Sequence, residues 1–368
     1  MLTLHSSGVS SIHAMGAVAI VHDFFAPERF MKISVLIPCH NEEKFVQKCV
    51  ESCLAQTRKA EQILVVNDGS TDRSALVLAQ FQGYIDVLAL PSATGNKSYA
   101  QQHGLPYITG DVFVTLDGDT ILDPNFLKYV EEDFTAHPSA CAVSGYVKSL
   151  KYNWLTAVRE LDYIIGQDLY KTAQSYIGAL FVIPGCAGAF KTETFRNCIA
   201  FDHDTLTEDL DFTYKFHERY LPIVYDRRAV AYTQDPATLA QYANQMRRWY
   251  AGGWQNLRKH YRLLGKPNNS LALSLMYVEG LIFAAILFLL PMIDIRYFEI
   301  FFIPYAVFIL GLGTYAAFVR KRFDLLLYSP AYVILLYVNS AIFLEQFWKE
   351  IVLRKTNLVW FHPERRET

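Results

Sequence analysis

The strongest constraint on this 368-residue chain is a set of long apolar stretches towards its C-terminal end. Residues 271–293 read LALSLMYVEGLIFAAILFLLPMI, interrupted by a single acidic residue, Glu279, and a second apolar run covers residues 297–319. Each run is long enough to cross the hydrocarbon core of a bilayer as a helix. We therefore expect both to span a membrane, and the alternative is a buried helical domain.

A third apolar stretch, residues 325–347, is less uniform than the first two. Its interruptions are Ser329, Pro330, Asn339, Ser340 and Glu345. A segment of this kind either crosses the membrane or lies in, or re-enters, the interface. We therefore assign residues 266–348 to transmembrane or interfacial helices.

The charges that flank these stretches test the topology. The basic sequence RKRFD, residues 320–324, separates the second stretch from the third, and the positive-inside rule places it in the cytoplasm. The tail at 349–368, which we predict to be cytoplasmic, is also basic. Three full crossings would put these two segments on opposite sides. Either the third stretch does not fully cross, or a further segment exists.

Residues 1–30 make a poor signal peptide, because they have no basic n-region and only a short apolar patch near residues 17–21. We expect them to be a disordered extension or an over-long start. The sequence MKISVLIPCHNEE, which begins at Met31, starts with a strand pattern. A folded domain is therefore predicted for residues 31–265.

Composition argues against nucleic-acid binding and against a disordered acidic segment. Lys and Arg number 34 against 36 for Asp and Glu, a net charge of −2, so there is no basic field to attract nucleic acid and no acidic tail. The six cysteines include no CxxC pair and no metal-ligand spacing with histidine. We read them as reduced thiols in a cytosolic domain, most of them buried.

The first part of the folded domain alternates short apolar runs with amphipathic stretches, which is typical of an α/β fold with a mostly parallel sheet. The predicted strands cover residues 33–38, 62–70, 84–90, 111–119 and 140–147. Helices are expected to begin at Asn41 and at about Asp72. The long amphipathic segment 153–183 either lies along the membrane or packs on the sheet.

Polar residues follow three of these strands, at the edge where an open parallel sheet binds its ligands. They are Pro38, His40, Asn41 and Glu42 where the first strand ends, Asn67 and Asp68 where the second ends, and Asp117 and Asp119 where the fourth ends. A divalent cation would stabilise acids gathered there, and carboxylates without histidine or thiolate partners favour Mg²⁺ or Mn²⁺. Taken alone, Asp117 and Asp119 would also fit an Asp-Gly turn.

The sequence contains neither a GK[ST] phosphate loop nor a GxGxxG after the first strand, so phosphate chemistry here would be led by a metal. Five motifs, VLIPCHNEE, VVNDGSTD, TLDGD, LTEDLDFTYK and QMRRW, occur in this order between residues 35 and 249. Together they resemble the family 2 inverting glycosyltransferases of GT-A fold, a Rossmann-like sheet. Within that family they are most similar to the membrane-embedded synthases of cellulose, hyaluronan, chitin oligosaccharide and poly-N-acetylglucosamine.

The resemblance implies a nucleotide-sugar site at the strand ends. Pro38, Asn41 and Glu42 would line the nucleoside pocket, and Asp68 would lie near the uracil and ribose. Lys97, in GNKSYAQQHGL, would contact the nucleotide unless it is a surface lysine.

The resemblance also implies a metal site at the TLDGD motif. Asp119 would hold Mg²⁺ or Mn²⁺ on the diphosphate, and Asp117 would bind the metal or the ribose. The metal would stabilise the leaving nucleoside diphosphate, so a protonated acid is not required.

By the same resemblance, TED at 207–209 would be catalytic, with Asp209 as the general base beside Glu208. The attacking hydroxyl of the acceptor must lose its proton as the new bond forms, and a nearby carboxylate can accept it. One base and one metal suffice for a single displacement with inversion, unlike the two carboxylates of hydrolases. The alternative role for Asp209 is a helix N-cap.

Two further segments would complete the site. Gln245, Arg248 and Trp249 of QMRRW would contact the nucleotide where it meets the acceptor sugar, because a guanidinium suits a diphosphate and an indole suits a sugar face. PGCAGAF resembles the family's small-residue segment beside the acceptor. Its candidate acceptor-binding residues, together with Trp249, are Gly185, Cys186 and Ala187. The alternative for QMRRW is a helix at the membrane surface, and the alternative for PGCAGAF is a plain turn.

These expectations define a multi-pass enzyme of the inner or plasma membrane with a cytoplasmic catalytic domain. It would transfer hexosyl or N-acetylhexosaminyl groups from a UDP-sugar to a growing polysaccharide. The alternative is single-sugar transfer to a membrane lipid or polyprenyl phosphate, and product length separates the two. Apolar segments are fewer than in cellulose or hyaluronan synthases, so a partner membrane or export subunit is expected. A catalytically silent subunit would not need this full set of acids and the Arg-Trp pair.

Overall fold

The computed structural model describes residues 30–265, 270–356 and 358. The predicted N-terminal extension, apart from Phe30, lies outside the described residues, and so does most of the predicted basic tail. Within the described residues, the chain from Lys32 onward forms one unit.

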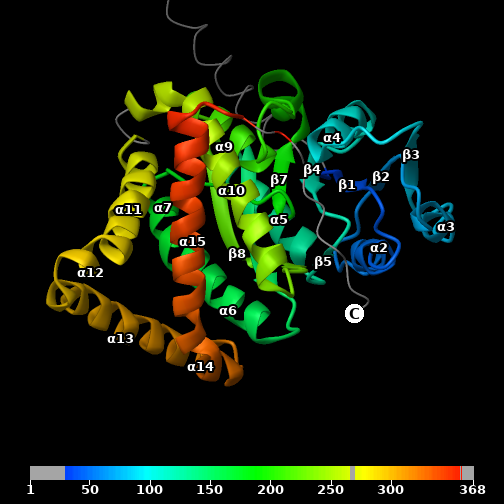
Figure 1. The fold of residues 1–368 in the computed structure, drawn as a ribbon. Helices are drawn as coiled ribbons and strands as arrows, with labels where there is room; N and C mark the ends of the chain where they lie inside the picture. Colours follow the sequence, from blue (N-terminus) through cyan, green and yellow to red (C-terminus); the bar gives the residue numbers. More distant parts are fainter. Residues whose placement is uncertain (1–29, 266–269, 357, 359–368) are drawn as a thin grey trace, which may run out of the picture. The chain divides into compact units, whose positions relative to one another are not determined.

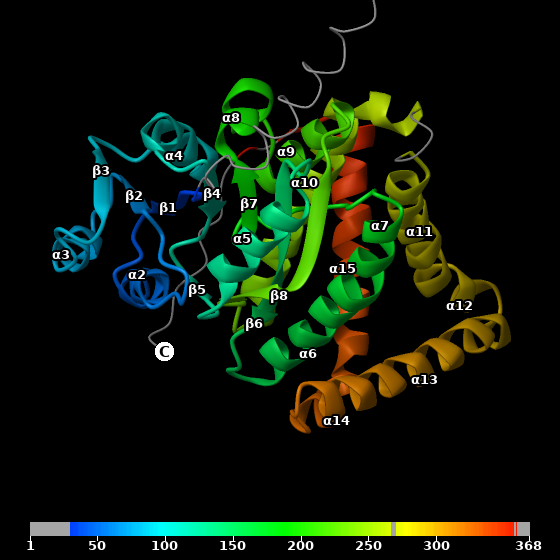
Figure 2. The same ribbon diagram turned by 180° about the vertical axis from the view of Figure 1, so that it is seen from behind.

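A single mixed sheet with strand order β3-β2-β1-β4-β7-β6-β8-β5 forms the centre of the fold (Figures 1 and 2). The five predicted strands are present as β1 (Ile33–Cys39), β2 (Gln62–Asp68), β3 (Asp86–Leu90), β4 (Val112–Thr115) and β6 (Ala142–Ser149). The sequence pattern did not reveal β5 (Thr120–Leu122), β7 (Gly188–Lys191) and β8 (Ile223–Thr233). The predicted α/β fold with apolar C-terminal helices is therefore confirmed, with a sheet larger than expected.

Parallel pairing holds for one half of the sheet, where β1 lies between β2 and β4 and β3 pairs with β2. The other half is mixed, because β7 runs antiparallel to both β4 and β6. Because β6 and β7 are antiparallel, β7 begins at the edge of the sheet at which β6 ends. The carboxyl ends of β1, β2 and β4 therefore share one edge, which is the place predicted for a ligand.

Short helices connect the strands: α2 (Val46–Leu54), α3 (Ser74–Ala79), α4 (Lys97–Gly104), η1 (Leu105–Tyr107), α5 (Phe126–Ala136), α8 (Thr192–Thr194) and η3 (Phe195–Ile199). The helix predicted from Asn41 begins only at Val46. Asn41 has a left-handed φ of 55°, and its side-chain oxygen accepts a hydrogen bond from the Thr71 N–H at 2.8 Å. Asn41 thus forms a turn that joins two loops, and a left-handed residue cannot continue a right-handed helix.

A cluster of phenylalanines fixes helix α9 (Glu208–Glu218) against the sheet. Phe212 and Phe216 of α9 are fully buried and pack on Phe190 of β7, with ring centroids 5.1 and 5.8 Å apart. Aromatic groups of this size dominate the burial of a core. This packing anchors the helix whose first residues are Glu208 and Asp209.

The amphipathic segment 153–183 packs on the domain, as one of its two predicted placements requires. It forms α6 (Trp154–Tyr163), the π-helix η2 (Ile164–Lys171) and α7 (Thr172–Tyr176). Apolar residues of α6 lie in a core shared with α10 (Leu239–Lys259). In η2 the Gln167 amide exchanges hydrogen bonds with the Val147 backbone of β6, at 2.9 and 2.6 Å.

The three predicted apolar stretches are helical. After η4 (Tyr261–Gly265), the chain forms α11 (Ser270–Phe288), α12 (Leu290–Ile293), α13 (Ile295–Val319), α14 (Asp324–Tyr328), η5 (Ser329–Ala331), α15 (Tyr332–Phe347) and η6 (Trp348–Val352). Three helical stretches, Met276–Ile293, Ile295–Val319 and Asp324–Val352, are long and apolar enough to cross a membrane.

Helix α15 lies alongside α10 and runs parallel to it (Figure 1). The Tyr242 hydroxyl donates to Asn339 Oδ1 at 2.7 Å, near the start of α10. Near its end, the Gln255 amide donates to Glu350 Oε1 at 2.9 Å. Between them, Arg247 pairs with Glu345 at 3.1 Å. Two of the polar residues that interrupt the third apolar stretch, Asn339 and Glu345, therefore face α10.

The basic loop at 320–324 also contacts the α/β domain. Arg320 Nε lies 3.5 Å from a Glu160 carboxylate oxygen of α6, and Arg320 Nη2 lies 3.6 Å from Asp168 of η2. Lys151 lies 3.5 Å from Asp324. Both ends of the segment that contains α15 are thus held on the same domain.

Candidate active site

A cavity of about 460 Å³ opens at the carboxyl ends of β1, β2 and β4. This volume is within the range of small-molecule sites. The predicted residues that line it are Pro38, Glu42, Asp68, Lys97, Asp117, Asp119, Gly185, Cys186, Glu208, Asp209, Gln245, Arg248 and Trp249. Asn41 and Ala187 do not line it. Asn41 is used in the turn described above, and Ala187 is buried, with its N–H donating to the Pro184 carbonyl.

Asp68 shapes one end of the cavity by holding a loop. Its two carboxylate oxygens accept hydrogen bonds from the backbone N–H and the hydroxyl of Thr94, both at 2.8 Å. The adjacent Gly69 makes this possible, since a Cβ there would lie 2.3 Å from the Ala93 nitrogen. Residues 93–96 therefore form a wall of the cavity that only the fold reveals.

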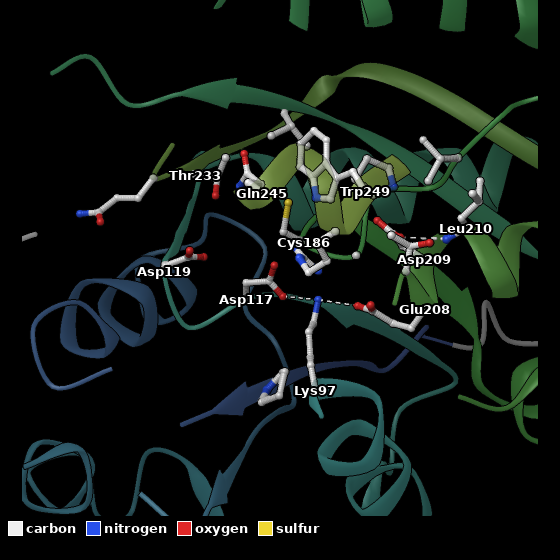
Figure 3. Close-up of a pocket in the computed structure, with 18 of the residues that line it drawn as sticks. Lys97, Asp117, Asp119, Cys186, Glu208, Asp209, Leu210, Thr233, Gln245 and Trp249 are labelled. Atoms are coloured by element: carbon white, nitrogen blue, oxygen red, sulfur yellow. Dashed lines mark hydrogen bonds and ion pairs between the residues drawn. The ribbon is translucent and has the colours of Figure 1, made fainter. Parts of the chain in front are cut away.

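Lys97 bridges two acidic groups from distant parts of the chain (Figure 3). Its Nζ lies 2.5 Å from Asp117 Oδ1 and 2.8 Å from Glu208 Oε1. Burial alone would lower the pKa of Lys97, but the two carboxylates outweigh it and hold that pKa above its ordinary value. Lys97 is thus not a surface lysine: it carries positive charge at the centre of the site.

Asp117 and Asp119 provide the donor atoms that a hard divalent cation requires. Asp119 is 5 % exposed and lines the cavity, where the Thr120 hydroxyl donates to its Oδ1 at 3.2 Å. The Lys97 ammonium approaches Asp117 Oδ1 without hydrogen-bond alignment, and that oxygen is otherwise unsatisfied. Two carboxylates with no histidine or thiolate fit Mg²⁺ or Mn²⁺, with diphosphate oxygens as further ligands.

A second acidic cluster, Asp202, Asp204 and Asp211, is not suited to a metal. Lys259 Nζ lies within 2.8 Å of all three carboxylates, and Lys215 pairs with Asp202 and Asp211. The lysines already supply the positive charge that a cation would bring. Together with the His260 hydrogen bond they outweigh the effect of burial and hold the pKa of Asp211 well below its usual range.

Asp209 is half-buried at the second position of α9 and faces the cavity. The N-cap of α9 is Thr207, so capping is not the role of Asp209, although its Oδ1 accepts a hydrogen bond from the Leu210 N–H at 2.9 Å. Burial and the adjacent Glu208 carboxylate raise the pKa of Asp209 to about 6. A carboxylate in this range is ionised at neutral pH and basic enough to accept a proton.

The small-residue segment brings its backbone against the acids. A Cβ on Gly185 would lie 2.9 Å from Lys97 Nζ and 3.1 Å from Glu208 Oε1. Cys186 follows in the cavity wall near Asp117 (Figure 3), and burial raises the pKa of its thiol well above the ordinary value. The segment therefore adjoins the catalytic candidates, as expected for an acceptor-binding element.

Helix α10 forms the opposite wall through Gln245 and Trp249 (Figure 3), and its Arg248 also lines the cavity. Gln245 Oε1 is buried without a hydrogen-bond partner in the described residues, so it is available to a ligand. The Arg248 charge lowers the pKa of Asp209, which places the two groups within electrostatic reach. The Trp249 ring stacks near the Arg159 guanidinium, 5.1 Å from ring centroid to Cζ.

A close contact between α10 and Thr207 sets the position of the acids. A Cβ on Gly252 would lie 2.4 Å from Thr207 Oγ1. The buried Asn256 amide donates to the Thr207 carbonyl at 3.1 Å and to the Thr207 hydroxyl at 3.0 Å. Helix α10 thus supports the start of α9 directly.

Gly252→Ala is expected to destabilise the protein by about 1–3 kcal/mol, because overpacking forces the Thr207 backbone to move. Glu208 and Asp209 should shift with it, since they follow Thr207 in the chain. Gly253→Ala is the matched control: its Cβ would lie 3.4 Å from the nearest atom, Tyr277 Oη, an ordinary contact. The free energy of unfolding of that variant should be unchanged or higher by up to about 1 kcal/mol, because alanine has a higher helix propensity than glycine. Denaturant unfolding of the two purified variants makes the comparison, and equal stabilities would contradict the role of Gly252.

Several lining residues escaped prediction. They include Ala93, Gly95, Asn96, Tyr163, Gln167, Tyr170, Lys171, Gln174, Phe181, Val182, Thr233, Gln234, Asp235 and Met276, whereas His40 was among the predicted strand-end residues. Thr233 ends β8 and the next two residues follow it, so recognition of the apolar runs of that strand would have pointed to them. The residues from η2, α7 and α11 had no such signal.

Comparison with known proteins gives a family match and more distant relatives. Residues 34–194 match the family model described as Glycosyl transferase family 2. Poly-beta-1,6-N-acetyl-D-glucosamine synthase of Staphylococcus epidermidis is 29 % identical over 231 residues, which is 62 % of this chain and 56 % of the relative. The Staphylococcus aureus (strain COL) synthase of the same name is 27 % identical with the same coverage. The aligned part thus spans little more than half the length of these curated relatives.

Solved structures match more of the chain at lower identity. The mannosyltransferase PcManGT from Pyrobaculum calidifontis, in complex with GDP-Man and Mn²⁺, has a TM-score of 0.61 and 18 % identity over 89 % of this chain and 88 % of its own. S. aureus TarS 1-349 in complex with UDP has a TM-score of 0.50 and 16 % identity over 87 % and 92 %. At these identities the likeness establishes the fold.

Proposed function

We propose that this protein is a family 2 glycosyltransferase that transfers a sugar from a UDP-sugar to a growing polysaccharide, with inversion, and the match of residues 34–194 to the family model supports this. One observation carries the proposal. A single cavity gathers Asp117 and Asp119, the Glu208–Asp209 pair and the Gln245–Trp249 face of α10. The names of the poly-beta-1,6-N-acetyl-D-glucosamine synthases support an N-acetylhexosaminyl donor.

In this mechanism Asp209 accepts the proton of the acceptor hydroxyl as its oxygen attacks the anomeric carbon. The bond from that carbon to the diphosphate breaks, and the nucleoside diphosphate leaves on the opposite face. Mg²⁺ or Mn²⁺ held by Asp119 and Asp117 would neutralise the leaving diphosphate. Lys97 adds fixed positive charge beside them, in contact with Glu208. Arg248 supplies a guanidinium suited to phosphate oxygens.

The remaining lining residues divide between donor and acceptor. Pro38, Glu42 and Asp68 border the nucleoside end, where Asn41 would act through the loop that it holds. Gly185, Cys186 and Trp249 border the acceptor end, and Ala187 would act through the backbone of the same segment.

A transfer assay tests the function. Membranes that contain the protein are incubated with labelled UDP-sugars and Mg²⁺ or Mn²⁺, and the products are separated by size. A long labelled polymer from one donor supports the proposal, whereas a single-sugar lipid product would replace it with lipid glycosylation. Absence of transfer from every UDP-sugar, with a folded protein, would contradict it.

The membrane arrangement is part of the proposal. We infer that α11 and α13 cross the inner or plasma membrane, while α15 stays on the cytoplasmic side with the catalytic domain. The contacts of Asn339 and Glu350 with α10 support this, since α10 also lines the active site. Two crossings place both basic segments on one side and remove the conflict in the charge pattern.

Cysteine labelling checks this topology. Met292→Cys lies between α11 and α13 at a position that is 82 % exposed, and it should react with an impermeant maleimide in intact cells. Phe323→Cys and Leu353→Cys should react only after permeabilisation. Labelling of Leu353→Cys in intact cells would show a third crossing instead.

The pH dependence of transfer follows from Asp209. Its pKa of about 6 lies above the ordinary value, so the reactive ionised form is lost as the pH falls through about 6. We expect kcat/KM to drop about tenfold per pH unit below that point and to level off above it. Rate measurements between pH 4.5 and 8 test this, and a profile that is flat down to pH 4.5 would contradict the assignment of Asp209 as base.

A further inference from the structure

Lys171 is a buried cation that faces the active-site cavity without an acidic partner. It ends the π-helix η2, is 4 % exposed and lines the cavity. Its Nζ donates to the Ser144 hydroxyl at a long 3.3 Å and lies 5.3 Å from the centre of the Tyr225 ring. Among the described residues no carboxylate forms an ion pair with it. Since an ammonium group has three donors, Lys171 retains capacity for a ligand.

Other buried cations of the domain are matched with acids. Lys97 contacts Asp117 and Glu208, and Lys215 contacts Asp202 and Asp211. Arg159 contacts Asp162 at 2.6 Å and Asp235 at 3.5 Å. A buried charge without a partner is unfavourable, so an unmatched one facing a cavity points to a charge that a ligand supplies.

The surroundings of Lys171 place it on the acceptor side. The Asp209 carboxylate and the Cys186 thiol are close enough to influence its pKa, which burial lowers to about 7. The cavity here is also lined by Tyr163 and Tyr170, whose rings suit the faces of sugars. Any acceptor sugar that gives its proton to Asp209 would therefore lie within reach of Lys171.

Nearby polar groups are already engaged. Gln167 bonds the β6 backbone, and the Gln174 side-chain oxygen accepts from the Phe181 N–H at 2.9 Å. The Tyr163 hydroxyl donates to Asp235 at 3.1 Å, and the Tyr170 hydroxyl donates to Glu279 at 3.1 Å. Compared with these described neighbours, Lys171 thus retains unused donors.

We infer that Lys171 forms a subsite for an oxyanion on the acceptor sugar, a carboxylate or a phosphate, next to the hydroxyl that Asp209 deprotonates. The acceptor is accordingly an acidic glycan. The inference rests on the proposed glycosyl transfer and names the acceptor class for the same site.

A matched pair of ligands tests the subsite. Methyl β-D-glucuronide and methyl β-D-glucoside differ only at C6, which is a carboxylate in the first and a hydroxymethyl group in the second. Calorimetry measures the binding of each to the full chain in detergent with UDP and Mn²⁺ present. The wild type should bind the glucuronide at least about tenfold more tightly, the range of one charged hydrogen bond. Glucose 6-phosphate shows whether a phosphate serves as well as a carboxylate.

Lys171→Met should abolish the preference between the two glycosides. Lys128 is exposed and lies outside the cavity, so Lys128→Met should leave the preference unchanged. Thermal unfolding gives a second readout. Removal of an unmatched buried charge should raise the Tm, whereas a purely structural lysine would lower it and leave the preference intact. An unaltered preference in Lys171→Met would overturn the inference.

UDP binding separates this inference from the proposed function. If the wild type binds UDP with Mn²⁺ but does not distinguish the two glycosides, the acceptor subsite is wrong and donor binding stands. If UDP does not bind at all, the proposed function itself fails. Binding of dodecyl phosphate in preference to both the glucuronide and glucose 6-phosphate would replace the acidic glycan with a lipid phosphate.

Discussion

Asp209→Asn is expected to reduce sugar transfer by about 10²–10⁴-fold, the contribution typical of a positioned general base. Asparagine has nearly the same shape and can still accept the Leu210 hydrogen bond, but it cannot take a proton from the acceptor. Helix α9 should therefore keep its structure while the chemical step fails. Transfer from the labelled UDP-sugar measures the rate, and UDP titration of the same preparation shows that donor binding persists.

A neighbouring acid of the same helix provides the control for Asp209. Asp211 is buried against Lys215, Lys259 and His260 and does not line the cavity. Asp211→Asn should lower stability by about 3–5 kcal/mol, because it leaves buried cations without their partner. Its transfer rate per folded molecule should stay near wild type. Should Asp209→Asn retain more than a third of wild-type transfer, another group must be the base.

Asp119→Asn and metal removal are expected to have the second large effect. Metal ions stabilise transition-state charge by several kcal/mol, and about 4 kcal/mol corresponds to a roughly 10³-fold loss of rate. Asp119 is 5 % exposed and lines the cavity, and Lys97 already pairs with Asp117, so we expect Asp119 to be the main metal ligand. EDTA should reduce transfer to background, and added Mn²⁺ or Mg²⁺ should restore the wild type but not Asp119→Asn.

The second acidic cluster supplies a matched control for this prediction. Asp204 is exposed and pairs with Lys259 at 2.7 Å, so Asp204→Asn should leave both stability and metal dependence close to wild type. A metal titration of transfer compares the two variants. Transfer that survives EDTA in the wild type would argue that Lys97 and Arg248 neutralise the diphosphate without a metal.

Much of the site could be predicted from the sequence because the strands that carry it are local patterns. The runs that form β1, β2 and β4 are recognisable by their apolar residues, and parallel strands place their carboxyl ends on one edge. The residues after them, Asp68 and Asp117, therefore had to lie close together. The apolar stretches were equally evident, because a helix of bilayer length requires only composition and length.

Other features depended on contacts between segments that are distant in the sequence. The local periodicity of apolar residues does not encode such contacts. The Lys97 bridge joins residues from α4, β4 and α9 through their packing on the sheet. Lys171 reads in sequence as an ordinary polar residue of an amphipathic helix, and only the fold buries it with no ion-paired acid among the described residues.

The sequence alone thus determined the order of the strands that precede the acids, the chemistry of those acids and the presence of apolar helices. Tertiary structure decided which charges are neutralised and which remain open to a ligand. It also placed α15 beside α10, because the side chains of Asn339 and Glu350 have their hydrogen-bond partners there. Hydrophobic periodicity is a property of neighbouring residues, whereas charge compensation is a property of groups that meet only after folding.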